Sequence, residues 1–457
     1  MNEEIKKIPA DYTEGSIIGS ILKMGLPSMF GFLAQHIYSM VDMYWVSKLP
    51  GEESGVAAIT FFANILWLFF SFNQLVGPGS VAIISRRYGE KDYDAAEKAI
   101  KETILLKLFF GGVFGLVGFL TVDKMLIVVG AEGDALRQGI EYGRIMFVGL
   151  GVMYATYSIF TAMRGIANPK MAMILMISSN LLNLILDPFF IFGWLGLPAL
   201  GISGAAYASV FSFALTLLVG IILLYGNYTN VKLNLKGKKP VSMIAMWKIL
   251  KIGIPSWLGS MSFSGSRLII TPLVATFGTA VVAAYGIAGQ IFGFGIMLLV
   301  GIGLGLSSLI GHNLGGGKYE RAKKTADQSI LLGIGMMIVF GLIVYFGADI
   351  IMKLFFNNPE TINIGVGILQ IFAFSFPFFG AFIMLEEIHA GVGLNTPAMI
   401  VNIVHSWGFQ VLPIIIFVEV FGFGQTAIWW ALACAGMISS IGFYIYYRRG
   451  RWLLQKV

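Results

Sequence analysis

Long apolar runs separated by short polar stretches most restrict how this chain can fold. Twelve runs of about 20 residues or more follow one another, and an α-helix of that length crosses the hydrocarbon core of a bilayer. Alternating strand patterns of the outer-membrane type are absent from the sequence. We expect spans at roughly 16–46, 55–84, 99–122, 138–163, 170–193, 199–226, 247–276, 280–309, 327–347, 361–389, 397–420 and 426–447. The predicted fold class is an all-α polytopic membrane protein with twelve transmembrane helices.

The composition excludes an ordinary soluble domain. Of 457 residues, 57% are hydrophobic and 12% are charged, whereas soluble domains carry about a quarter charged residues. The net charge of +7 comes from basic residues in the tails and in alternate loops. They include Arg86, Arg87, Lys91, Lys98 and Lys101, then Lys232, Lys236, Lys238 and Lys239, then Lys318, Arg321, Lys323 and Lys324, and finally Arg448, Arg449, Arg451 and Lys456. This positive-inside bias predicts a plasma (inner) membrane protein with both termini in the cytoplasm, and it does not indicate nucleic-acid binding.

The first residues, MNEEIKKIPADYTEG, contain acidic side chains and no compact apolar segment that ends in a small-residue cleavage site. We interpret them as a retained cytoplasmic tail rather than a signal peptide. The single cysteine, Cys434, excludes an intramolecular disulfide and a cysteine metal cluster.

The chain repeats itself with an offset of about 228 residues. ILKMGLP begins at Ile21 and ILKIGIP begins at Ile249, and Gly165 recurs as Gly393 at the same offset. Each copy holds six spans, an even number, so the copies should run in the same direction and be related by an axis along the membrane normal. We therefore predict a first lobe at 1–225, a cytoplasmic linker at 226–245 and a second lobe at 246–457.

Two aspartates within apolar spans occur in one copy of the repeat alone. Asp42 and Asp187 lie in the first copy, and the offset places Ile270 and Ile415 at the same positions in the second. A charge inside the membrane is costly to keep and commonly marks a functional site. A scaffold built twice, with ionisable groups in only one copy, indicates a binding site rather than packing.

Helical spacing places further polar side chains on the same faces. The residues four and seven positions before each aspartate are Tyr38 and Gln35 on the first span, and Asn183 and Asn180 on the fifth. Both aspartates lie roughly 26–28 Å from the cytoplasmic start of their helix. If the two faces meet, they form an oxygen-rich pocket inside an apolar bundle.

Such a pocket can bind a coupling cation. Two carboxylates at close range do not both ionise easily, so one can hold a proton near neutral pH. Alternatively, oxygen atoms of Asp42, Asp187 and Asn183 could replace the water shell of Na⁺. These residue types serve H⁺ and Na⁺ equally. The structural alternative is that each aspartate caps a neighbouring helix.

Other polar residues in the spans are candidates for lining the path of a substrate or ion. Glu386 and Glu387 lie near the cytoplasmic end of the tenth span, where they could attract cations or form a second protonation site. Solvated carboxylates at a helix end are the simpler interpretation. Arg267 in the seventh span could reach the interface or pair with a carboxylate. The remaining candidates are Gln35, Asn64, its repeat counterpart Gln290, and Ser209.

No known catalytic motif appears. GGGKY at 315–319 lacks the spacing and the Ser or Thr of a phosphate-binding loop, so we expect no enzyme activity and no organic cofactor. The energy for any transport should then come from an ion gradient. Pro27 removes a backbone hydrogen bond inside the first span and is the predicted hinge.

The chain resembles the multidrug and toxic compound extrusion (MATE) family over nearly its whole length. The resemblance rests on GLPS at the start of the first span, the RRYGEKDYDAAEKA loop after the second, the Tyr38–Asp42 pair and the Asn180–Asn183–Asp187 series. It implies a V-shaped transporter that alternates between outward- and inward-facing states. Such a protein would export organic, usually cationic or amphipathic compounds in exchange for H⁺ or Na⁺.

The resemblance also implies roles for single residues. The Tyr38–Asp42 pair and the Asn180–Asn183–Asp187 series would form an ion site in the first lobe. Ser209 would stand where several relatives carry threonine. Relatives with an acid on the seventh span differ from this chain, because SWLGSMSFSGSRLIIT contains none. Ion coupling through the second lobe would then need Glu386 or Glu387.

Two further functions stay open. A flippase for a lipid-linked saccharide would need a basic central cavity, for which Arg267 is the sequence's main candidate. A receptor or scaffold that does not transport would not need paired carboxylates confined to one repeat. For an exporter we expect a monomer in the lipid bilayer that binds small organic substrates.

Overall fold

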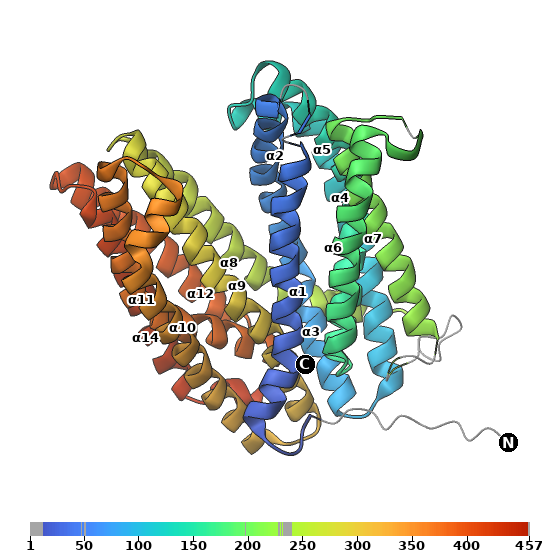
Figure 1. Cartoon of the computed structure of the whole chain (residues 1–457). Helices are drawn as coiled ribbons and strands as arrows, with labels where there is room; N and C mark the ends of the chain where they lie inside the picture. Colours follow the sequence, from blue (N-terminus) through green and yellow to red (C-terminus); the bar gives the residue numbers. More distant parts are fainter. Residues whose placement is uncertain are drawn as a thin grey trace.

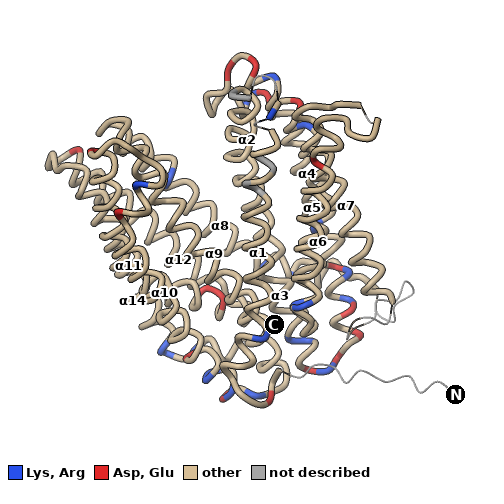
Figure 2. Tube along the Cα trace, viewed as in Figure 1, with Lys and Arg blue, Asp and Glu red and all other residues tan. Residues whose placement is uncertain are grey.

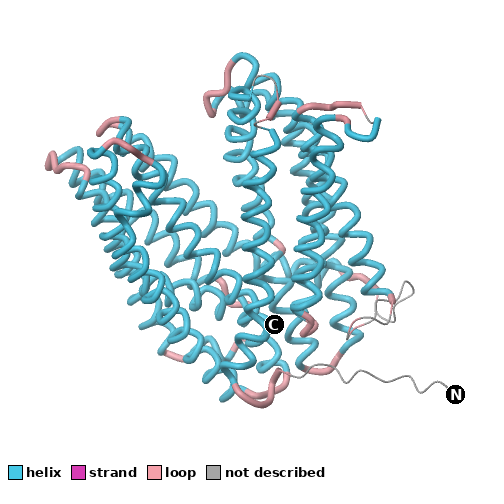
Figure 3. The backbone as a smooth tube through the Cα atoms, in the orientation of Figure 1, coloured by secondary structure: helices cyan, strands magenta, loops and turns pink. Residues whose placement is uncertain are grey.

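The computed structural model consists of helices and loops, and no strand occurs among the residues it describes (Figure 3). These residues are 12–46, 48–49, 52–196, 198–226, 229, 231 and 240–455, without the side chains of residues 39, 40, 42, 43, 52 and 53. Most of the predicted linker at 226–245 therefore lies outside the described residues.

The first half of the chain forms the six predicted spans. The helices are α1 (Ile17–Val46), α2 (Glu52–Phe72), α3 (Gly77–Gly89), α4 (Tyr93–Val128), α5 (Gly133–Gly165), α6 (Pro169–Phe192) and α7 (Ile202–Tyr225). The short 3₁₀ turn η1 (Asn73–Leu75) joins α2 and α3 into the second span, and η2 (Trp194–Gly196) follows α6. Local sequence sets several helix ends. Asp92 caps α4 by accepting a hydrogen bond from the Ala95 backbone N–H at 3.0 Å, and Gly193 ends α6 in a left-handed conformation.

The second half repeats this pattern. It contains α8 (Met243–Ala275), α9 (Thr279–Gly315), α10 (Tyr319–Phe355), α11 (Pro359–Val392), α12 (Thr396–Ile403), α13 (Leu412–Ile415) and α14 (Thr426–Arg448). Two π-helical segments, η3 (Val404–Val411) and η4 (Ile416–Val420), continue α12 and α13 into the eleventh span, and η5 (Arg451–Leu454) follows α14. Eleven spans of the described chain are long and apolar enough to cross a membrane; α8 is the less apolar twelfth.

The helices form two lobes arranged as a V (Figure 1). Helices α1 to α7 make one arm and α8 to α14 the other, and the arms converge where α1 and α3 pack against α9. Most Lys and Arg positions gather at this convergent end (Figure 2), which we call the basic end and define by the end of α3, the start of α10 and the end of α14. The predicted all-α, twelve-span, two-lobe fold is confirmed.

Glycines let the two arms touch at backbone distance. A Cβ atom added to Gly25 of α1 would lie 2.9 Å from the Ile302 Cα of α9. One added to Gly305 of α9 would lie 2.5 Å from the Gly25 backbone nitrogen. Small residues permit this close approach of helices in membranes, where apolar burial alone drives little association. The junction between the lobes is therefore a direct contact of backbones.

We predict that Gly305→Ala lowers the free energy of unfolding by about 1–3 kcal/mol, because the new methyl group has no space between α1 and α9. Thermal unfolding of the purified protein in detergent measures the change. Gly335→Ala on α10 is the matched control, since nothing lies within 4 Å of an added Cβ there. An equal loss in both variants would contradict this account of the junction.

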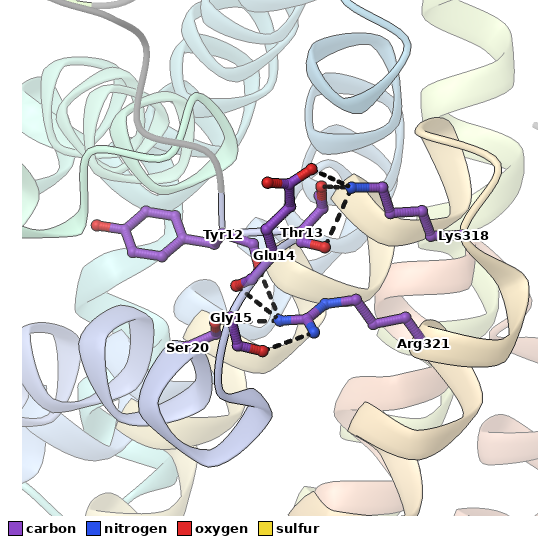
Figure 4. Close-up of polar contacts among 7 residues, drawn as sticks. All are labelled: Tyr12, Thr13, Glu14, Gly15, Ser20, Lys318 and Arg321. Carbon is purple, nitrogen blue, oxygen red and sulfur yellow. Dashed lines mark hydrogen bonds and ion pairs between the residues drawn. The ribbon is translucent and has the colours of Figure 1, made fainter.

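The segment before α1 is tied to the second lobe (Figure 4). The Lys318 Nζ donates to the Thr13 carbonyl at 3.2 Å, to the Thr13 hydroxyl at 2.7 Å and to the Glu14 carboxylate at 3.3 Å. The Arg321 guanidinium donates to the carbonyl oxygens of Gly15 at 2.9 Å and Glu14 at 3.0 Å. These bonds hold the beginning of α1 against the first turn of α10.

Replacing Arg321 with Gln should release this segment. Amide hydrogen exchange of residues 12–20 should become about tenfold faster, because charge-assisted hydrogen bonds to the carbonyls are lost. Lys324→Gln serves as the control, since Lys324 is an exposed cation on the same helix. Unchanged exchange in Arg321→Gln would show that these bonds do not hold the segment.

Candidate functional site

Three helices of the first lobe bring the predicted ion-site residues toward one another. Helix α6 packs against both α1 and α7, and it carries Asn183 and Asp187 on one face. Their exposed fractions are 2% and 0%. Pro188 follows Asp187 inside α6 and lacks a backbone N–H, so the helix is weakened next to the carboxylate.

Ser209 of α7 is the centre of the polar network. Its hydroxyl lies 2.9 Å from the Tyr38 hydroxyl of α1 and 3.1 Å from the Asn183 amide of α6. The bonding pattern orients this amide so that Nδ2 donates to Asp187 Oδ2 at 3.1 Å and Oδ1 accepts from Ser209 Oγ. A continuous path therefore runs from Tyr38 through Ser209 and Asn183 to Asp187.

The Asp42 side chain lies outside the described residues, although its position on α1 follows Tyr38 by one helical turn. Whether it meets Asp187 stays a prediction. Among the described residues no group of three or more His, Cys, Asp or Glu side chains could hold a metal ion. The oxygens of Tyr38, Ser209, Asn183 and Asp187 nevertheless suit a proton or a hard monovalent cation.

Two further predicted site residues are the amides Gln35 and Asn180. The Gln35 amide donates to the Tyr157 hydroxyl of α5. Asn180 lies one turn before Asn183, and its Nδ2 is buried with no hydrogen-bond partner in the described structure. Helical spacing alone thus gives the face of each amide but not its partner on a neighbouring helix.

Three other candidates lie apart from this network. Asn64 is exposed and donates to the Thr60 carbonyl of its own helix at 3.2 Å. Its repeat counterpart Gln290 is also exposed. Arg267 is exposed on α8 and interacts electrostatically with Tyr285 of α9. Among the described residues, the contacts of these three do not assign them to an ion site.

The acidic pair of α11 is only partly exposed. The Asn402 amide of α12 donates to Glu386 Oε1 at 2.5 Å, and Glu387 lies beside Gly303 of α9. Glu386 is thus hydrogen-bonded between two helices, which differs from the fully solvated position favoured by sequence. Tyr157 and Asn402 were not among the predicted site residues, because they lie on helices other than those of the two aspartates.

Comparison with known proteins places the chain among transporters. The MatE family model matches residues 27–189 and 255–416, two stretches that begin 228 residues apart at Pro27 and Pro255. The chain is 25% identical over 456 residues to the "Probable multidrug resistance protein YpnP" of Bacillus subtilis, covering 98% of both chains. It is 27% identical over 447 residues to the "Multidrug export protein MepA" of Staphylococcus haemolyticus, covering 97% of both.

A solved structure has the same fold. It is described as the outward-facing conformation of a multidrug resistance MATE family transporter of the MOP superfamily. The two structures superpose with a TM-score of 0.88 and 24% sequence identity, over 99% of this chain and 100% of the other. The double match of the family model agrees with the internal repeat.

Replacing Ser209 with Ala should lower the free energy of unfolding by about 1 kcal/mol, because the hydroxyl joins Tyr38 to Asn183. Ser212→Ala, one turn further along α7, is the matched control. Ser212 is 1% exposed and its hydroxyl has no hydrogen-bond partner in the described structure. Thermal unfolding in detergent compares the two, and equal values would contradict a bridging role for Ser209.

Proposed function

We propose that this chain, which belongs to the MatE family of membrane transporters, is a secondary active antiporter that exports organic compounds in exchange for H⁺ or Na⁺. The names of the relatives, multidrug resistance and multidrug export proteins, support organic substrates, and we propose cationic or amphipathic ones. The observation that carries the proposal is the fully buried Asp187, which is joined through Asn183 and Ser209 to Tyr38 on a second helix. Its repeat counterpart is the apolar Ile415.

The physical basis of coupling is the cost of charge in an apolar bundle. An ionised carboxylate is unfavourable there unless it is hydrated, paired or bound to a cation. Loading H⁺ or Na⁺ onto Asp187, together with Asp42, would remove this cost. The loaded state would then tolerate a dry, closed arrangement of α1, α6 and α7, whereas the unloaded state would favour one open to water.

Helix α1 is suited to pass this change to the rest of the protein. It carries Tyr38 at the network and Pro27 about three turns earlier, where the missing N–H permits a bend. Gly25, two residues before Pro27, touches α9 of the second lobe. Bending at Pro27 would move the upper part of α1 while its lower part stays against α9.

The arrangement in the membrane follows from charge. We assign the basic end to the cytoplasm of a plasma (inner) membrane, because short cytoplasmic loops carry an excess of Lys and Arg. At this end Arg321 donates to the Gly15 carbonyl near the start of the chain, and Arg86 donates to the Gln455 carbonyl near its end. Both chain ends would then be cytoplasmic, and the transporter would work as a monomer.

The test is efflux from proteoliposomes that contain the purified protein and a fluorescent organic cation. An imposed pH gradient and an imposed Na⁺ gradient are applied in turn. We expect transport under one of the two gradients. Asp187→Asn and Asp42→Asn should each reduce it by about tenfold or more, because the neutral amide cannot be loaded and unloaded with the ion.

Asp349→Asn is the control, since Asp349 is a 55% exposed aspartate on α10 that pairs with Lys353. It should transport at the rate of the unmodified protein. Unchanged efflux in both first-lobe variants would reject the proposed ion site. Absence of transport under either gradient, with protein confirmed to be folded and inserted, would reject the antiporter itself.

A further inference from the structure

A buried arginine lies at the basic end of the first lobe with little local bonding. Arg164 occupies the last turn of α5 and is 4% exposed. Its Nη2 donates to the Thr161 hydroxyl at 3.4 Å, and its Nε and Nη1 are buried without a hydrogen-bond partner in the described structure. Buried guanidinium groups are normally fully bonded or paired with an acid. This one needs an opposite charge from elsewhere.

The opposite charge comes from the second lobe. Glu387 is the acidic group that acts most strongly on Arg164, and Arg164 is the basic group that acts on Glu387. A second buried cation, Lys107 of α4, is 1% exposed and is repelled by Arg164. Glu386, the residue before Glu387, already accepts a hydrogen bond from Asn402. The attraction between Arg164 and Glu387 therefore crosses between the lobes.

Helix α9 packs against the surroundings of both groups. An added Cβ on Gly303 would lie 3.3 Å from the Glu387 Cδ, so the glutamate packs directly on α9. Further along α9, the His312 Nε2 lies 2.7 Å from the carbonyl of Gly165, the residue that follows Arg164. One helix of the second lobe thus contacts Glu387 and the residue next to Arg164.

Arg164 is also connected to α1, the helix that carries Tyr38. Arg164 interacts electrostatically with Tyr157, two helical turns earlier on α5. The Tyr157 hydroxyl accepts a hydrogen bond from Gln35 of α1. The surroundings of Arg164 therefore include the helix of the predicted ion site.

The repeat makes this arrangement one-sided. The offset of 228 residues places Val392 opposite Arg164 and Ile159 opposite Glu387. Each lobe thus supplies a charge of one sign where the other lobe has an aliphatic residue. A structural charge required by the repeated fold would be expected in both copies, whereas a charge couple between the copies needs one of each sign.

We infer that Arg164 and Glu387 form an interlobe charge couple that holds the two lobes together at the basic end, with Arg164 as a positioning residue for the transport cycle. In a low-dielectric junction an attraction over several ångströms is far stronger than in water. Opening the transporter at this end separates the couple and leaves two buried charges without a counterion. The couple thereby favours the conformation that is closed at the basic end.

The inference is tested by the distance between the lobes rather than by transport, so its outcome does not depend on the driving ion. Spin labels are placed at Lys170 on α6 and Lys324 on α10, both exposed positions at the basic end, with the exposed Cys434 replaced by Ser. Pulsed electron spin resonance in lipid nanodiscs measures the distance distribution. Glu387→Gln and Arg164→Gln should each raise the ratio of open to closed molecules by about fivefold or more.

Three further variants separate an electrostatic couple from a packing effect. Arg164→Lys should stay near the original distribution, since it keeps the charge. The charge swap Arg164→Glu with Glu387→Arg should recover much of the closed population. The double neutral variant should shift no further than either single variant, because both remove the same interaction.

Glu360→Gln is the control, because Glu360 is exposed at the start of α11, the helix that carries Glu387. It should leave the distances unchanged. The inference would be overturned if the double neutral variant raised the ratio of open to closed molecules by the sum of the two single effects. It would also be overturned if the charge swap had no larger closed population than the single variants. If the swap does not fold, the double neutral variant and Arg164→Lys still decide the question. A distribution unchanged by either single neutralisation would overturn it outright.

Discussion

A polar side chain inside a bundle of apolar helices has no bulk water to bond, so it must find its partner on a neighbouring helix. In the first lobe this requirement joins three helices through a single hydroxyl. Ser209 of α7 contacts both Tyr38 of α1 and Asn183 of α6, and Asn183 in turn donates to Asp187. In the proposed function, the relative positions of these helices would be linked to the protonation or ion occupancy of Asp187 by the same bonds.

Helix α1 connects this network to the other lobe. Its lower half is fixed by the backbone contact of Gly25 with α9, and the residues just before it are bound by Lys318 and Arg321. Its upper half carries Gln35 and Tyr38, which bond to α5 and α7. A single helix thus has one end held by the second lobe and the other end bonded within the first, with a proline between them.

The sequence predicted which helix faces carry the polar residues of the site better than it predicted their hydrogen-bond partners. The four-residue spacing of Asn183 and Asp187 correctly predicted a shared face, and the two side chains bond to each other. The same rule placed Asn180 and Gln35 on those faces, but the Asn180 Nδ2 has no hydrogen-bond partner in the described structure and Gln35 donates to Tyr157 of a different helix. Periodicity gives the direction of a side chain from its own helix, whereas the partner depends on which residue a neighbouring helix presents at that height.

The sequence by itself determined the helices, the duplication and the confinement of Asp42 and Asp187 to one lobe. The reason is that the bilayer requires about 20 apolar residues per span, and a charge among them is visible in the linear pattern. Only the tertiary structure decided that Ser209 joins Tyr38 to Asn183 and that the carbonyl of Gly165, next to Arg164, meets His312 of the second lobe. These contacts join residues more than 20 positions apart, and they depend on helix crossings set by glycine contacts that no local pattern encodes.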